Sequence, residues 1–361
     1  MKTKISIHYP ILAALLVGLL SPMAQAQQNL MVGFNRIDCR PESDTLVSVP
    51  FMKHPVAAEL RVSGSPDLTT LDRAVLALGQ SAGWPNDSLK DTYYVRFTSG
   101  AKAGHWYDII ANTATSITLD LNGAHGAGGI AAGDGFLVVK YWTLDSLFPP
   151  ASQTTIHVSS GTLGYQQKSL ILIPNVSAEG IDLPAEAVYL LTASGWKKGV
   201  KGYPAAGDTI LPPGLPFIIR HPRGVAATTF EPEGRVLRTA DAIELARASS
   251  TRQDNTVAVL RPVDVTLQDS GLDESAFIPS LGHDAADRRD ELLVFDNSVP
   301  GFNKSPSAAY YKVSGSWFRE DGKGAANPRA DQEALSASGG VVVRKAQGPN
   351  GMAAWKNNPN Y

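Results

Sequence analysis

Short apolar runs separated by turn-forming residues make up most of this chain. The runs are rich in Val, Ile, Leu, Tyr and Thr, and clusters of Gly, Pro, Asn and Asp lie between them. In residues 116–121, polar and apolar side chains alternate, which is the pattern of a strand with one solvated face. Comparable runs cover residues 45–49, 92–98, 136–142, 170–173, 188–192, 217–220, 256–260, 291–295 and 341–344. The pattern predicts β-strands along nearly the whole chain.

Two short segments favour a helix instead. Residues 68–79 place Leu71, Val75 and Leu78 at helical spacing, although a strand also fits there, and residues 241–248 form a second candidate. Both segments are too short to organise an α/β sheet. We therefore expect an all-β protein of two or three small antiparallel domains, sandwich-like or barrel-like, built from repeated strand-turn-strand units.

Two stretches, residues 170–220 and 291–344, follow one plan. Each opens with an apolar strand (LILIPN, ELLVFDN), continues with an aromatic strand and a turn that ends in Trp196 or Trp317, and closes with a Gly, an apolar strand and a base (PFIIR, VVVRK). A weaker third copy combines DTLVSVPF, TYYVRFTSG and FLVVK near the N-terminus. Because each copy has to bury the same apolar face, we interpret the repeated aromatic residues as core.

Proline and glycine clusters indicate the boundaries between these copies. Pro149 and Pro150 follow the first region, and consecutive prolines cannot continue a β-ladder. The Glu-Pro-Glu-Gly sequence at 231–234 suits a linker. We predict four regions, namely a removable leader over residues 1–26, an N-terminal β domain over 27–150, a second β region over 151–235, and a third β region with a C-terminal tail over 236–361.

The first 26 residues have the features of a signal peptide. Lys2 and Lys4 form a basic start, residues 11–20 form an apolar run, and residues 24–26 offer an Ala-Gln-Ala cleavage site. The apolar run is about half the roughly 20 residues that a membrane-spanning helix needs. No later stretch of the sequence reaches that length. We expect export to the periplasm, the outer surface or the extracellular space, with no membrane span after cleavage.

Composition and charge exclude several classes of protein. Hydrophobic residues make up 43% of the chain and charged residues 18%, which excludes an intrinsically disordered chain. The 32 basic and 34 acidic residues nearly cancel, so nothing favours a nucleic-acid partner. Cys39 is the single cysteine, so an intramolecular disulfide and a thiolate metal site are both excluded. We expect Cys39 to be buried, because a free cysteine behaves as a small hydrophobic residue.

The residues that could support catalysis do not form a convincing pattern. Residues 79–83 match the G-x-S-x-G sequence around a nucleophilic serine, here Ser81, but Trp-Pro-Asn-Asp follows and favours a turn over the helix that this device requires. The histidines of the mature chain are scattered, without the short spacings typical of zinc ligands. We predict that the protein is not an enzyme, and that a hydrolase would need a site assembled from distant residues.

An acidic stretch is the candidate for a metal site, and it would hold calcium. Asp269, Asp273 and Glu274 lie in a segment rich in Asp and Glu, and calcium prefers hard oxygen ligands. Their spacing is not that of an EF-hand loop, and Arg288 and Arg289 neutralise part of the stretch. A solvated loop is the alternative interpretation. No other cofactor is expected.

Six tryptophans suggest carbohydrate binding, because flat rings can stack on the apolar faces of sugars. Trp196 and Trp317 recur at one place in the plan, as core residues would. Trp84, Trp106 and Trp355 are less constrained and are the candidates for a glycan platform. Burial in a core is the commoner use of a large aromatic side chain.

Several long phrases carry a resemblance to a known family. DTLVSVPF, TYYVRFTSGAKAGHWYDIIANTATSITLDL, GDGFLVVKYWTLDSLFPP, QDNTVAVLRPVDVTL, ELLVFDNSVPGFNKSPSAAYYK and the tail at 355–361 resemble uncharacterised exported proteins that occur as many paralogues in verrucomicrobial bacteria. The likeness covers nearly the whole mature chain. It implies export and a β-rich fold, and it implies no activity and no catalytic residue, since none is assigned to the family.

Together these observations favour a non-enzymatic protein of the cell surface or extracellular matrix. Its role would be structural, adhesive or that of a scaffold, with self-association as the expected interaction. The alternative is a module that binds a cell-surface polysaccharide.

Overall fold

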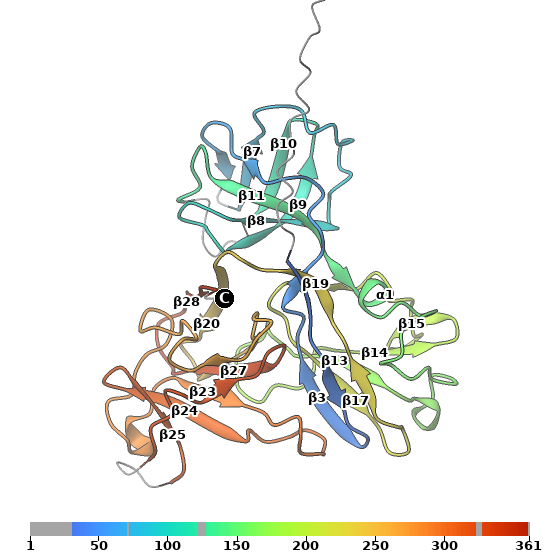
Figure 1. Cartoon of the computed structure of the whole chain (residues 1–361), viewed down its shortest axis with the longest axis vertical. Coiled ribbons are helices and arrows are strands. Elements are labelled where there is room, and N and C mark those ends of the chain that lie inside the picture. The colour runs from blue at the N-terminus through green and yellow to red at the C-terminus, as the bar shows by residue number, and fades with distance from the viewer. Residues whose placement is uncertain (1–30, 71, 122–127, 323–326, 360–361) are drawn as a thin grey trace, which may run out of the picture. The chain divides into compact units, whose positions relative to one another are not determined.

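The strands of this protein pair in antiparallel sheets, and two of these sheets have the same strand order (Figure 1). The computed structural model describes residues 31–70, 72–121, 128–322 and 327–359. Residues Val32–Tyr361 form one compact unit. The fold is all-β, as predicted, and the helical segments are only α1 (Leu144–Leu147) and two single 3-10 turns, η1 (Gly164–Gln166) and η2 (Ala285–Asp287), within the described ranges.

The first sheet has five strands. Their order is β15 (Gly195–Lys198), β14 (Ala187–Thr192), β13 (Leu170–Ile173), β17 (Phe217–His221) and β3 (Ser43–Val47). The second sheet, in the order that matches the first, has β25 (Ser316–Arg319), β24 (Ala308–Val313), β23 (Glu291–Val294), β27 (Gly340–Lys345) and β21 (Gln253–Ala258). The two stretches that share a plan in the sequence therefore form equivalent strands of two equivalent sheets.

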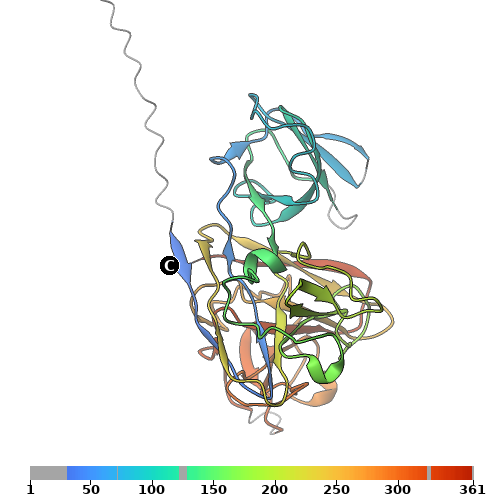
Figure 2. The same cartoon turned by 90° about the vertical axis from the view of Figure 1, so that its right-hand side faces the viewer.

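A third, seven-stranded sheet lies in the chain between β3 and β13. Its order is β5 (Leu60–Arg61), β11 (Gly135–Lys140), β8 (Tyr93–Phe97), β9 (Trp106–Asn112), β10 (Ser116–Asp120), β7 (Arg73–Ala77) and β6 (Asp67–Thr70). Val62, directly after β5, forms a bridge with Leu78, directly after β7. This bridge brings two distant strands of the sheet together, so the sheet curls round on itself (Figure 2). It encloses an apolar core that includes Phe97 and Phe136. We call it the barrel-like sheet.

Short ladders complete the architecture. They are β1 (Val32–Phe34) with β19 (Glu233–Val236) and β4 (Phe51–Met52), β2 (Ile37–Cys39) with β18 (Thr228–Phe230), β12 (Trp142–Thr143) with β16 (Ile210–Leu211), β20 (Asp241–Arg247) with β28 (Gly351–Asn357), and β22 (Val265–Thr266) with β26 (Ala334–Leu335). The β12–β16 and β22–β26 ladders occupy corresponding places in the chain order around the two matching sheets. Cys39 in β2 is buried, as expected, and its burial raises the pKa of the thiol to about 11.

Both segments that favoured a helix form strands. Residues 67–70 make β6 and residues 73–77 make β7, where Ala74 and Leu76 alternate into the core with period two. Leu71 lies outside the described residues. Residues 241–247 make β20, which pairs along its whole length with β28. Helix and strand cannot be distinguished by pattern in so short an apolar run, and here the partner strand decides.

The strand pairing also crosses one predicted region boundary. β3 lies in the predicted region 27–150 but pairs with β17 of the predicted region 151–235. The barrel-like sheet takes its strands from residues 60–140, inside the predicted first region. The first region thus contributes strands to the barrel-like sheet, to the first sheet and to three of the short ladders.

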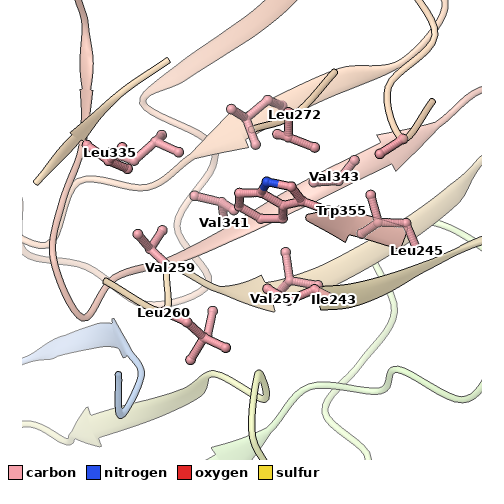
Figure 3. Close-up of a cluster of buried hydrophobic side chains, with 14 of the residues drawn as sticks. Ile243, Leu245, Val257, Val259, Leu260, Leu272, Leu335, Val341, Val343 and Trp355 are labelled. Carbon is pink, nitrogen blue, oxygen red and sulfur yellow. The ribbon is translucent and has the colours of Figure 1, made fainter. Parts of the chain in front are cut away.

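Each sheet packs against an apolar cluster. Trp196 and Trp317 occupy equivalent positions and are each 2% exposed, so both are core residues as predicted. Trp196 lies with Phe148 and Phe217 against the first sheet, and Trp317 lies in the cluster of the second. Figure 3 shows part of this second cluster, where Leu245, Leu272 and Val343 surround another indole ring.

Two loops join the matching sheets reciprocally. The first arm, residues 174–186, connects β13 to β14 of the first sheet, and the second arm, residues 295–307, connects β23 to β24 of the second sheet. Each arm docks on the outer edge strand of the opposite sheet. Such an edge presents unpaired backbone groups that invite pairing with another chain.

The second arm docks on β3 around an ion pair. Arg220 in β17 is the cross-strand neighbour of Asp44 in β3, and its Nε and Nη2 atoms donate to the two carboxylate oxygens at 2.6 Å each. Asn303 in the arm donates its N–H to the same carboxylate at 2.7 Å and accepts from Arg220 Nη2 at 2.7 Å. The Asp44 N–H donates to the Gly301 carbonyl at 2.9 Å.

The first arm repeats this arrangement on β21. Arg344 in β27 donates from Nε and Nη2 to the carboxylate of Asp254, its cross-strand neighbour, at 2.7 and 2.9 Å. Asp182 in the arm donates its N–H to Asp254 at 2.9 Å and accepts from Arg344 at 2.9 Å. The Asp254 N–H donates to the Gly180 carbonyl at 2.9 Å. We call each of these two constellations a clasp.

Backbone conformation explains the residue types at the tips of the arms. Gly180 and Gly301 have φ of 137° and 144°, values that L side chains rarely adopt. Asp182 and Asn303 have φ of 52° and 48°, in the left-handed region where Asp and Asn are enriched. The spacing Gly-x-Asp or Gly-x-Asn is therefore what turns each arm back onto the carboxylate.

Replacing the arginine of one clasp is expected to destabilise the fold. In Arg344→Met, the Asp254 side chain, 11% exposed, loses its bidentate partner, so the free energy of unfolding should fall by about 3 kcal/mol. The matched control is Arg36→Met, whose 3.8 Å pair with Glu231 is exposed on both sides and should matter by at most about 0.5 kcal/mol. Urea unfolding of both variants makes the comparison. Equal losses would contradict the structural role of the clasp.

The strand position after each clasp arginine holds a buried polar side chain. In β17 it is His221, whose Nδ1 lies 2.9 Å from Ser169 Oγ and whose Nε2 lies 2.7 Å from Thr228 Oγ1. In β27 it is Lys345, which donates to the Ala276 carbonyl and to the Asp290 carboxylate. Both side chains are fully enclosed.

Acid should weaken the fold through His221. Burial and the neighbouring His157 lower the pKa of His221 from 6.5 to about 4. The unfolded chain therefore takes up this proton at a higher pH than the folded chain does. The contribution of the neutral histidine to stability is complete above pH 6.5 and is lost as the pH falls from 6.5 towards 4, a loss of about 3 kcal/mol. Urea unfolding between pH 7 and pH 4 should show a smaller decline in His221→Gln than in the wild type. Parallel declines would contradict this assignment.

Candidate functional site

The three tryptophans that were candidates for a glycan platform lie in different environments. Trp355 in β28 is 0% exposed, and its Nε1 donates to the Ser270 carbonyl at 2.7 Å (Figure 3). Neither face of its ring is open to a ligand. Trp84 is partly buried against the core of the barrel-like sheet. Trp106 is partly buried against the apolar cluster that contains Trp317 and Trp355. The three candidate tryptophans therefore do not form one platform.

Trp106 lines a cleft of about 430 Å³. The start of β9, the strand β20 and residues 212–215 contribute its walls, which we call the Trp106 cleft. Its lining includes His105, Trp106, Tyr107, Pro212, Glu244 and Met352. Apolar and aromatic side chains outnumber polar ones in the lining, which is typical of a pocket that binds a small organic group.

Two tyrosines hold the Trp106 ring in place. Tyr94 and Tyr141 meet it edge to face, with ring centroids 6.0 and 6.2 Å away and interplanar angles of 74° and 82°. This is the favoured geometry for aromatic pairs. The Tyr141 hydroxyl is itself tied to Asp108 by a hydrogen bond. The indole is thus fixed at the cleft by its neighbours.

His105, Tyr107 and Glu244 form the polar side of the cleft. His105 Nδ1 lies 3.0 Å from Glu244 Oε1, and the histidine is 8% exposed. The Tyr107 ring stacks over His105 with centroids 6.4 Å apart and an interplanar angle of 12°. Tyr107 is 5% exposed, yet its hydroxyl has no hydrogen-bond partner within the described part of the chain. Burial and the Glu244 carboxylate raise the pKa of Tyr107 to about 12.

A buried ion pair fixes β20 beside the cleft. Arg96 in β8 lies 2.7 Å from Asp241 Oδ1, and the two side chains are 1% and 5% exposed. The same guanidinium donates to the Ala240 carbonyl at 2.9 Å. Since Asp241 lines the cleft, this pair ties one wall of the cleft to the barrel-like sheet.

The candidate calcium residues make local turn contacts. Asp269 accepts from Thr266 Oγ1 at 2.8 Å, and Asp273 accepts from the Ser275 N–H at 2.9 Å. The Ser275 hydroxyl also lowers the pKa of Asp273. Glu274 is exposed. Among the residues that the structure describes, no group of three or more His, Cys, Asp and Glu side chains converges to hold a metal ion.

Ser81 lies in an exposed loop after β7. Its Oγ accepts a hydrogen bond from the Gly83 N–H at 3.3 Å. Residues 81–85 continue as irregular chain followed by turns. The strand-to-helix junction that would expose a nucleophile and supply an oxyanion hole is not formed at this position.

Comparison with other proteins adds no family. No protein-family model, curated protein or solved structure matches the chain. No helix in the described ranges has the length and apolarity needed to cross a membrane.

Sequence reasoning identified Trp106 but missed the polar groups beside it. His105 and Tyr107 flank Trp106 in the sequence, so a sequence-based argument could have included them. Glu244 lies 139 positions further on, in a segment that favoured a helix, and nothing local indicates its contact with His105. The clasp residues were missed for the same reason.

The different roles of Trp355 and Trp84 can be measured through stability. Trp355→Phe removes a buried hydrogen bond and leaves a cavity, so it should cost about 2 kcal/mol in the free energy of unfolding. Trp84→Phe, at a partly buried position, should cost less than about 1 kcal/mol. Urea unfolding followed by circular dichroism distinguishes them. A larger loss for Trp84→Phe would contradict the assignment of Trp355 to the core.

Proposed function

We propose that this protein is an exported, non-enzymatic component of the cell surface or extracellular matrix, acting as a structural or adhesive element. The signal peptide predicted from the sequence of residues 1–26, which lie outside the described residues, supports export, and the resemblance to exported paralogous proteins points the same way. Self-association is the interaction through which such a component would act. The two matching sheets support an internal repeat as the building plan of the chain.

The use of charged residues supports a structural role. The bidentate pairs of the two clasps hold the arms, and the arms cover the edge strands β3 and β21. Covered edges do not pair indiscriminately with other chains. Association would then occur through side-chain surfaces in a defined manner, as a scaffold requires.

The observation that carries the proposal is an exposed apolar side chain on the corresponding loop of each repeat. In the first loop the Ser160 N–H donates to the Gln166 carbonyl, and in the second the Leu281 N–H donates to the Asp287 carbonyl. Tyr165 in the first loop is 82% exposed and Leu281 in the second is 73% exposed. The two side chains stand at different positions of the corresponding loops, since Leu281 aligns with Ser160 rather than with Tyr165. Two separate apolar contacts on one chain would allow each copy to bind two others.

Polysaccharide binding is the second candidate, and the Trp106 cleft favours it. This role is compatible with self-association, because neither Tyr165 nor Leu281 belongs to the lining of the cleft. An adhesive protein would use both properties.

Sedimentation of the mature protein, residues 27–361, tests the proposal. A concentration series should show ordered growth beyond a dimer, and Tyr165→Ser with Leu281→Ser should shift the chain towards monomer without lowering its melting temperature, because both side chains are largely exposed. Val299→Ser, at a position 55% exposed on the second arm, is the matched control and should assemble like the wild type. A monomer at every concentration would contradict self-assembly as the function.

A further inference from the structure

The Trp106 cleft combines three features that suit a ligand. One wall is apolar, one side chain is aromatic and fixed, and a buried hydroxyl in the lining lacks a partner among the described residues. We propose that the Trp106 cleft binds one or a few units of a neutral sugar chain. The proposal names a ligand class and residues that the structural role does not require.

The apolar part of the cleft suits the carbon-bound hydrogens of a sugar ring. The Trp106 ring is oriented by Tyr94 and Tyr141, so little conformational freedom is lost when a ligand stacks on it. At the mouth, Val176 is 47% exposed and Met352 is 41% exposed. These apolar side chains would be covered by a ring lying against them.

The polar part of the cleft suits hydroxyl groups. A buried polar group without a partner is costly, and such a group in a native structure calls for an explanation. A sugar hydroxyl both donates and accepts, so it can pair with the Tyr107 hydroxyl in either sense. Because burial keeps the pKa of Tyr107 near 12, this hydroxyl is neutral and can itself donate at physiological pH.

The charges of the cleft favour a neutral ligand over an anionic one. Glu244 and Asp241 belong to its lining, and both carry carboxylates. Asp241 is paired with Arg96 and Glu244 with His105, so no surplus of positive charge faces a ligand in the lining. An acidic polysaccharide would bring its carboxylates or sulfates close to these groups. Like charges in a partly desolvated site repel.

Size supports a short segment of a chain. At about 430 Å³ the cleft lies within the range of pockets that take small organic ligands. A polysaccharide would therefore place one or a few units here, and a second copy in a self-associated form would add avidity without a new type of contact. The proposal needs no self-association, so the two can fail independently.

The test measures binding of the mature protein to soluble neutral polysaccharides by isothermal titration calorimetry. The panel contains hydroxyethyl cellulose, laminarin and galactomannan, with alginate as the acidic counterpart and denatured casein as a peptide probe. We expect saturable binding to at least one neutral polysaccharide and none to alginate. Trp106→Ala should weaken that binding about tenfold, the equivalent of losing one aromatic contact.

Three variants make the outcome specific. Tyr107→Phe should weaken binding about fivefold through the lost hydroxyl, and Trp84→Ala, at a tryptophan outside the cleft lining, should bind like the wild type. If Trp106→Ala fails to fold, Met352→Glu serves instead, because this exposed residue of the mouth can change without disturbing a core.

Two results would overturn the proposal. One is wild-type protein that binds none of the neutral polysaccharides, including the case in which it binds only casein. The other is binding that survives in Trp106→Ala, Tyr107→Phe and Met352→Glu alike. Sedimentation of the same variants shows whether self-association persists, so failure of the cleft is distinguishable from failure of the structural role.

Discussion

The two clasps are the interaction on which the rest of this structure depends. Each one joins three segments that are distant in the chain, namely two strands of one sheet and an arm from the other. A bidentate guanidinium–carboxylate pair fixes both the direction and the distance of its partners, and the arm adds its backbone N–H and carbonyl to the same carboxylate residue. Because each sheet supplies the arm that covers the edge strand of the other, separating the two sheets would expose both edge strands.

The two matching sheets have a buried polar side chain at the same strand position, but the residue type differs. After the clasp arginine, β17 has His221 with two hydroxyl neighbours, and β27 has Lys345 with Asp290. Both are enclosed, and each makes two hydrogen bonds, one of them an ion pair for Lys345. A polar side chain in an apolar interior has to be paired. The first sheet meets this requirement with a neutral histidine between two hydroxyls, and the second meets it with a lysine paired with a carboxylate. The Trp106 cleft differs from these positions, because a hydroxyl in its lining is left without a partner among the described residues.

The sequence was sufficient for the fold class and for part of the core. Period-two alternation and turn residues predicted the strands, and the recurrence of Trp196 and Trp317 at one place in the plan predicted their burial. It was insufficient where a distant partner decides. Residues 241–247 favour a helix in isolation, but pairing with β28 makes them a strand. Asp44 and Arg220 are 176 positions apart, so no spacing rule connects them. The recurrence of Gly-x-Asp at 180–182 and Gly-x-Asn at 301–303 was the one local signal of the clasps, and its meaning depends on an edge strand elsewhere in the chain.

Amide hydrogen exchange at Asp44 and Asp254 tests the central claim most directly. These residues lie on edge strands, whose outward amides ordinarily exchange readily, but here each N–H donates to an arm carbonyl at 2.9 Å. If the clasps hold the matching sheets together, both amides should be strongly protected and should exchange with similar opening free energies, as one cooperative unit. Rapid exchange at either amide, while the central strands β13 and β23 stay protected, would contradict the account.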